Sequence, residues 1–226
     1  MSHPVLTPDA VPHALDVLAR RPKRWTGIVA RLLPVVALAA GCAGAEASSP
    51  PTQAAVASAT AHDGHGGHTM ATADRAAAML ATAAYQDVAV AETAGYASSV
   101  DTLGCFQNPE RGGMGVHYIN GDLMDATVDI TKPEALVYEL DATGAVTGLV
   151  AHEYIVPIEA WTSKQAPTLF GMQFHRHPTL PLWVLHTWLW KDNPGGVFED
   201  WNPAVRQCPA GVPIFGTDLP APTQES

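Results

Sequence analysis

A β-hairpin is predicted by the stretch Glu134-Ala-Leu-Val-Tyr-Glu-Leu140, which is followed by the loop Asp141-Ala-Thr-Gly144 and by the mostly apolar residues 145–156. In an antiparallel pair, the register decides which side chains share a face. A four-residue loop places Glu139 on one face with His152. One extra loop residue, or a bulge, places Glu139 with Glu153 instead. The sequence leaves both registers open.

The segments around this hairpin predict one helix and further strands. Apolar residues recur at spacings of three and four from Thr72 or Asp74 to about Ala94, and Gly95 can end the helix. Residues 112–118 and 182–190 are typical of strands, the second of them apolar on both faces. We therefore expect an α+β fold, with one N-terminal helix packed on a mainly antiparallel β domain. Residues 72–216 form the single domain and residues 217–226 a flexible tail.

The composition excludes some classes of protein. The chain has 226 residues, enough for one domain plus tails. It carries 12 Lys+Arg against 22 Asp+Glu, a net charge of −10. Proteins that bind nucleic acid concentrate Lys and Arg, so we expect no nucleic-acid partner.

The first 41 residues predict an export signal. A basic run ends at Arg31, and the uncharged apolar segment Leu32 to Ala40 follows it. A permanent membrane helix needs about 20 apolar residues, so this segment is instead typical of a secretory signal. Leu38-Ala-Ala-Gly-Cys42 resembles the lipobox of bacterial lipoproteins, which predicts a signal peptide of residues 1–41, lipidation of Cys42 and a location on the outer face of the cell membrane. Ordinary cleavage would give a secreted or periplasmic protein.

Residues 42–71 are predicted to be a disordered tether, because they are rich in Ala, Ser, Thr, Gly and Pro. His62, His65 and His68 lie within it at spacings of three. Neutral imidazoles at this spacing can wrap around one Zn or Cu ion, which makes these histidines a second candidate metal site. The alternative is a polar linker that binds no metal.

The two cysteines of the domain, Cys105 and Cys208, are expected to form a disulfide. An exported protein meets an oxidising compartment, where such a bond persists. The alternative is a pair of buried free thiols.

Four ionisable residues lie in otherwise apolar segments, where a charge is costly unless it is paired or bound to metal. They are His117, Glu139, Glu153 and His186. Two imidazoles and two carboxylates predict a Zn or Cu site with an open position. A metal-free acid/base pair and hydrogen-bonded core residues are the alternatives.

Two further groups of residues have features of binding sites. His175 and His177 have the H-x-H spacing of a chelating strand, but Pro178 follows them, and we expect a solvent-facing turn. The tryptophans are expected to be core residues, with a ligand pocket as the alternative. These are Trp183, Trp188, Trp190 and Trp201.

Six short segments of the domain form a recognisable set: Tyr85-Gln-Asp-Val, Ala94-Gly-Tyr96, Gly113-Met-Gly-Val-His-Tyr118, Pro133-Glu-Ala-Leu-Val-Tyr-Glu139, Glu153-Tyr and His186-Thr-Trp-Leu-Trp-Lys-Asp-Asn-Pro194. Together they resemble an uncharacterised family of exported actinobacterial and proteobacterial proteins. Its members often carry a second histidine where this chain has Leu182, and an aliphatic residue where it has His152. The resemblance implies no activity, but it favours Glu153 over His152 as a site residue.

Three functions are compatible with the sequence. The first is an exported, lipid-anchored domain that binds a transition metal. The second is a module that binds a small molecule in a Trp-lined pocket. The third is an enzyme that uses a His/Glu site. The signatures G-x-S-x-G, H-E-x-x-H and C-x-x-C do not occur in the chain, so no reaction is indicated.

Overall fold

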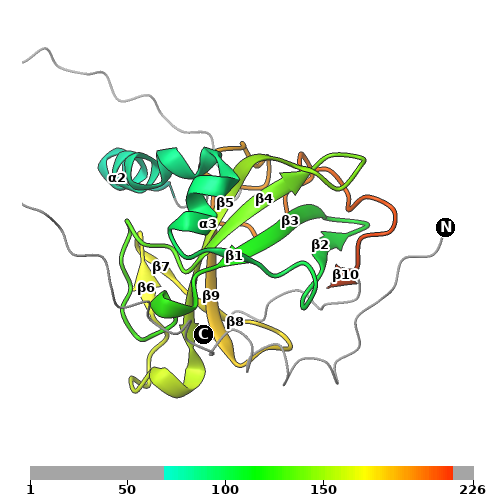
Figure 1. Cartoon of the computed structure of the whole chain (residues 1–226). Helices are drawn as coiled ribbons and strands as arrows, with labels where there is room; N and C mark the ends of the chain where they lie inside the picture. Colours follow the sequence, from blue (N-terminus) through cyan, green and yellow to red (C-terminus); the bar gives the residue numbers. More distant parts are fainter. Residues whose placement is uncertain (1–68, 216–226) are drawn as a thin grey trace, which may run out of the picture. The chain divides into compact units, whose positions relative to one another are not determined.

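The computed structural model describes residues 69–215, which are organised around one curled, mixed sheet of eight strands (Figure 1). The strands lie in the order β10-β2-β3-β4-β5-β9-β8, and β1 pairs with one end of β3. All paired neighbours are antiparallel except β10 and β2, which are parallel. The strands are β1 (Ala97–Ser98), β2 (Cys105–Asn108), β3 (Gly112–Ile119), β4 (Ala135–Leu140), β5 (Val146–Pro157), β8 (His175–Arg176), β9 (Leu182–Thr187) and β10 (Ile214–Phe215). A separate hairpin joins β6 (Thr168–Leu169) and β7 (Met172–Gln173).

The domain is mostly β, with its helices at the N-terminal end, which agrees with the predicted α+β class. The predicted helix is broken: α2 (Thr72–Thr82) continues as the 3₁₀ helix η2 (Ala83–Gln86), and α3 (Val88–Thr93) follows. The break has a local cause. The Asp87 side chain accepts a hydrogen bond from Ala89 N and caps α3, while Tyr85 O accepts from the Tyr138 hydroxyl instead of continuing the helix.

Two short 3₁₀ helices, η3 (Gly121–Leu123) and η4 (Ile158–Ala160), complete the regular elements. Figure 1 shows α2 and α3 together beside β5 and β4. Among residues 69–215, no helix has the length and apolar character that crossing a bilayer requires.

The hairpin of β4 and β5 follows the second of the two registers left open by the sequence. Val137 pairs with Ala151 but Tyr138 pairs with Leu149, so β5 contains an extra residue at this point. A second irregularity follows Glu139. The bulges lie on β5, so β4 alternates regularly.

The two faces of the sheet pack against different groups of residues. One face, which we call the site face, includes Ala135 and Val137 in a core cluster with Phe106, Ile155 and Trp188. The other, which we call the helix face, packs against the helical segment through a second cluster that includes Leu136, Tyr138, Leu149, Ala91 and Tyr96. Side chains of β4 therefore reach the two faces alternately.

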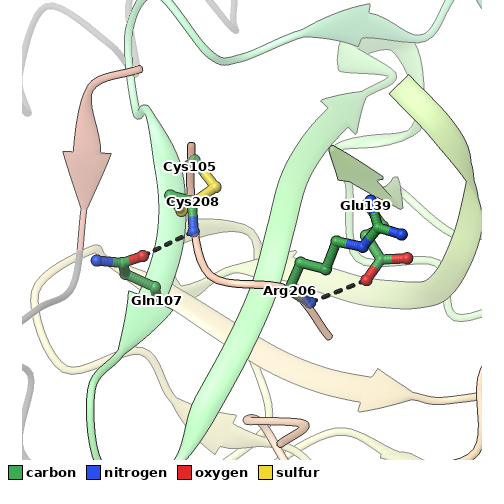
Figure 2. The surroundings of a disulfide bond; sticks show 5 residues. All are labelled: Cys105, Gln107, Glu139, Arg206 and Cys208. Atoms are coloured by element: carbon green, nitrogen blue, oxygen red, sulfur yellow. Dashed lines mark hydrogen bonds between the residues drawn. A yellow bond between two sulfur atoms is a disulfide. The ribbon is translucent and has the colours of Figure 1, made fainter. Parts of the chain in front are cut away.

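The predicted disulfide between Cys105 and Cys208 is confirmed. Figure 2 shows this bond at β2, where Gln107 Oε1 accepts a hydrogen bond from Cys208 N at 2.7 Å. The bond joins residues 103 positions apart in the sequence. It thereby fixes the C-terminal segment beside β2. Cys105 N donates a hydrogen bond to Pro213 O, and β10, which begins at the next residue, pairs with β2.

Glu134 provides a test of the packing of the core. It is only 2% exposed, and its Oε2 accepts a hydrogen bond from Ile155 N at 2.8 Å. Burial raises its pKa from 4.5 to about 8. The folded state therefore binds more protons than the unfolded state between these values, so stability falls as the pH rises through this window, by roughly 1.4 kcal/mol per pH unit.

We expect Glu134→Gln to remove this pH dependence, because glutamine keeps an acceptor oxygen but cannot ionise. Urea unfolding at pH 5 and pH 8 measures the effect. The wild-type protein should lose more stability than the variant between the two pH values. Equal losses would show that Glu134 ionises in the folded protein as it does in the unfolded chain.

Candidate metal centre

Three of the four predicted ligands come together on the site face: His117 from β3, Glu153 from β5 and His186 from β9. Glu153 and His186 are direct partners in the ladder between β5 and β9. His117 pairs with Val137 of β4, and Ala135 of β4 pairs with Glu153. The cluster therefore extends across β4, over two side chains that are small enough to leave it room.

The separations within this cluster suit ligands around one ion. His117 Nε2 lies 3.3 Å from Glu153 Oε2, and His186 Nε2 lies 3.6 Å from Glu153 Oε1. The second distance is too long for a hydrogen bond. Zinc binds nitrogen and oxygen at about 2.0–2.2 Å, so the ligand atoms of a tetrahedral site lie about 3.4 Å apart. One ligand atom from each residue lies within 4.8 Å of the other two.

Two buried nitrogen atoms of the cluster lack hydrogen-bond partners among the described residues. They are His117 Nδ1 and His186 Nε2. Both imidazoles are almost fully buried, at 3% exposure each. A buried polar atom without a partner is costly, and a metal ion at His186 Nε2 would supply one.

Asp200 completes the site on the far side of His186. Its Oδ1 accepts a hydrogen bond from His186 Nδ1 at 3.2 Å, and its Oδ2 lies 3.4 Å from His175 Nε2. Histidines that bind metal usually donate their other ring N–H to a carboxylate, which fixes the ring and makes it a better ligand. Asp200 holds His186 in this way, with Nε2 directed to Glu153.

Asp200 was not predicted from the sequence, because residues 193–203 contain only the patterns of turns and loops. Its position depends on a contact between distant segments. Gly113 and Asn202 exchange backbone hydrogen bonds at 3.1 and 3.0 Å, which brings the segment of Asp200 against β3. Gly112 has φ +117°, and a Cβ there would lie 2.4 Å from the backbone of Asn202. Only glycine permits this approach.

The electrostatics of the site favour a cation. Burial lowers the pKa of His117 and raises that of Glu153. Burial opposes charge on His186 too, but Glu153 and Asp200 outweigh it and raise its pKa. Burial likewise opposes charge on Asp200, yet the hydrogen bond and charge of His186 lower its pKa. Two carboxylates thus surround one imidazole, and a divalent ion in place of its proton would balance both.

Glu139, the fourth predicted ligand, does not belong to the cluster. Its carboxylate accepts hydrogen bonds from Lys191 Nζ at 2.8 and 2.9 Å and from Arg206 N at 2.8 Å, the last of them visible in Figure 2. Alternation along β4 places Glu139 on the site face, but four residues beyond Ala135, the partner of Glu153. That spacing is roughly 13 Å along a strand, so Glu139 is an ion-pair residue at the other end of β4.

His152 lies on the helix face, one residue from Glu153 but pointing the opposite way. Its Nε2 is 2.9 Å from Thr82 Oγ1 and accepts from Trp190 Nε1 at 3.3 Å. Burial lowers its pKa to about 3. His152 therefore connects α2 to the sheet as a neutral ring, and Glu153 is the member of the pair that reaches the cluster.

A cavity of about 50 Å³ adjoins the cluster, which is room for more than one water molecule. His175 and His177 line it and are half-buried, so the predicted solvent-facing turn is wrong for His175, which lies in β8, and only partly right for His177, which begins the turn after this strand. The reason is that β8 pairs with β9: His175 lies opposite Val184 on the site face, and His177 N donates a hydrogen bond to Leu182 O. Arg176 points the other way, 4.8 Å from the centre of the Trp183 ring.

The tryptophans do not gather around one pocket. Trp188 and Trp201 are buried in the core of the site face, while Trp190 packs on the helix face and Trp183 in a third cluster. Of the four, only Trp201 lines the cavity. The expectation that they are mainly core residues agrees with this arrangement.

The protein has a mainly β domain with a buried cluster of two histidines and one carboxylate beside an apolar cavity. No protein-family model, curated protein or solved structure matches this chain. The family resemblance of its motifs stays a prediction, as do lipidation at Cys42 and metal binding by His62, His65 and His68, which lie outside the described residues.

Proposed function

We propose that this domain binds one zinc ion through His117, Glu153 and His186. The observation that carries the proposal is the spacing of their buried ligand atoms, 3.3 and 3.6 Å, combined with Asp200 behind His186. A metal-free acid/base pair would bring donor and acceptor to about 2.7–3.2 Å, which fits these separations less well.

Zinc suits the donor set better than the other ion considered, copper. Both cysteines of the domain are joined in a disulfide, so the thiolate that Cu(I) and blue-copper sites use is not left among the described residues. Two imidazoles and one carboxylate are ligands that zinc accepts in sites with an open fourth position. An ion held in this way can polarise a bound group or activate water, and here the open position would face the cavity.

Metal analysis of the purified protein tests the proposal. We expect one zinc ion per chain and one tight site in a titration of metal-free protein. A variant with His62, His65 and His68 replaced by alanine should retain that site. Loss of zinc from this variant would instead assign the metal to the tether, and copper in place of zinc would contradict the choice of ion.

Asp200→Asn is expected to weaken zinc binding by about 10-fold to 100-fold, the usual cost of removing a carboxylate that orients a metal-binding histidine. Competition with a chromophoric chelator measures the affinity. Asp192→Asn is the matched control, because Asp192 is exposed and lies nearby in the sequence. Equal zinc affinities in the two variants would show that Asp200 does not support the zinc site.

We also propose that the protein is exported and anchored by a lipid at Cys42. The disulfide between Cys105 and Cys208 supports export, because such bonds persist in oxidising compartments. Cys42→Ser is expected to abolish lipid labelling and release the protein from membranes, and globomycin should block its processing. A variant that stays on the membrane would refute the anchor but not the metal site.

A further inference from the structure

We propose that the cavity beside the zinc centre binds a small carboxylate with an apolar body, its carboxylate directed to the metal and its hydrocarbon part to the cavity wall. This inference rests on the proposed zinc site and adds the chemical class of its ligand.

The wall of the cavity is apolar away from the cluster. It is lined by side chains such as Leu103, Phe106, Met114, Leu180, Val184 and Trp201. Polar groups gather at one end, where His117, Glu153 and His186 meet. An apolar wall with a few convergent polar groups is typical of sites for small molecules, in which the polar groups fix the orientation.

The polar end favours an anionic oxygen group. Zinc with three protein ligands has an open position for a further donor atom, and Glu153 is the only charged ligand, so the ion and its direct ligands keep a net positive charge. Asp200 also lines the cavity, but it offsets this charge only from behind His186. A carboxylate oxygen would fill the open position and neutralise that charge. Its second oxygen would still need a hydrogen-bond donor.

His177 supplies such a donor. Its Nδ1 accepts hydrogen bonds from Thr179 N at 3.3 Å and Leu180 N at 3.1 Å, so the proton of the neutral ring is on Nε2. The ring lines the cavity and is close enough to His117 and His186 for their charges to interact. Stacking on Phe215, with ring centres 6.2 Å apart, helps to fix its plane.

Calorimetric titration of the zinc-loaded, full-length protein with acetate, propionate and butyrate tests this inference, because a cavity of about 50 Å³ suits short chains. Each added methylene should raise the affinity about fourfold until the cavity is full. Butanol, which has the same chain length but no charge, should bind at least 10-fold more weakly than butyrate. Equal affinities for acetate and butyrate would overturn the inference.

Two variants test the two ends of the cavity separately. Met124→Trp narrows the apolar part, since Met124 is a half-buried lining residue, and should weaken the binding of butyrate but not of acetate. Met124→Leu is its control.

His177→Asn keeps an acceptor for the turn but loses the ring N–H. It should weaken the binding of both carboxylates about fivefold without changing the zinc affinity. A protein that binds no zinc would refute the proposed function and this inference together, whereas zinc binding without these effects would refute the inference alone.

Discussion

Glu153→Gln is expected to weaken zinc binding by at least about 100-fold, more than the loss of a residue that only orients a ligand. The substitution keeps the size of the side chain but replaces a charged ligand with a neutral amide. Without metal, the variant should fold at least as well as the wild-type protein, because burial disfavours the ionised carboxylate at this position. Only the stabilisation by zinc should be lost, about 2.7 kcal/mol when zinc is at 100 times the wild-type Kd.

Glu139→Gln is the matched control for this experiment. It makes the same chemical change on the same face of the sheet, but at a carboxylate that pairs with Lys191. We expect its zinc affinity to equal that of the wild-type protein and its stability to fall. Thermal unfolding with and without zinc separates the two effects. If Glu139→Gln lost zinc and Glu153→Gln did not, the assignment of the ligands would be wrong.

Removing the disulfide is expected to produce the largest loss of stability. A bond between residues 103 positions apart restricts the unfolded chain by about 4–5 kcal/mol in the chain-entropy account. The Cys105→Ser/Cys208→Ser variant should lose roughly this free energy of unfolding. The loss should also loosen the segment that carries Phe215, whose ring packs on Phe106 in the cavity wall.

Urea unfolding with and without reductant measures the contribution of the disulfide. Reduction should bring the wild-type protein to the stability of the double variant, and should leave the variant unchanged. A difference between them below about 1 kcal/mol would show that the bond contributes little to the folded state.

The sequence predicted the long strands β3, β4, β5 and β9, because their apolar runs are long and bounded by turn residues. It did not predict the short strands β1, β2, β6, β7, β8 and β10. It could not choose the register of the central hairpin, since this depends on where β5 bulges. The bulges near Val137 and Glu139 are set by packing between strands, which the local pattern does not contain. The break in the helix had a local signal, Asp87 as a capping residue, that the apolar spacing concealed.

The candidate site was only partly predictable for the same reason. His117, Glu153 and His186 stand out as ionisable residues inside strands, and their strands lie close together in the sheet. Glu139 is also an ionisable residue inside an apolar strand, but it lies four residues along β4 from Ala135, the partner of Glu153, and is too far from the cluster. Asp200, His175 and His177 lie in segments without periodicity, so only the fold reveals that they lie beside the cluster.

Diffraction from zinc-loaded crystals at the zinc absorption edge tests the central claim most directly, because the anomalous signal locates the ion itself. The account predicts one peak between His117, Glu153 and His186, at about 2.0–2.2 Å from a ligand atom of each. A peak elsewhere in the chain, or none at this cluster when zinc is present at saturating concentration, would contradict it.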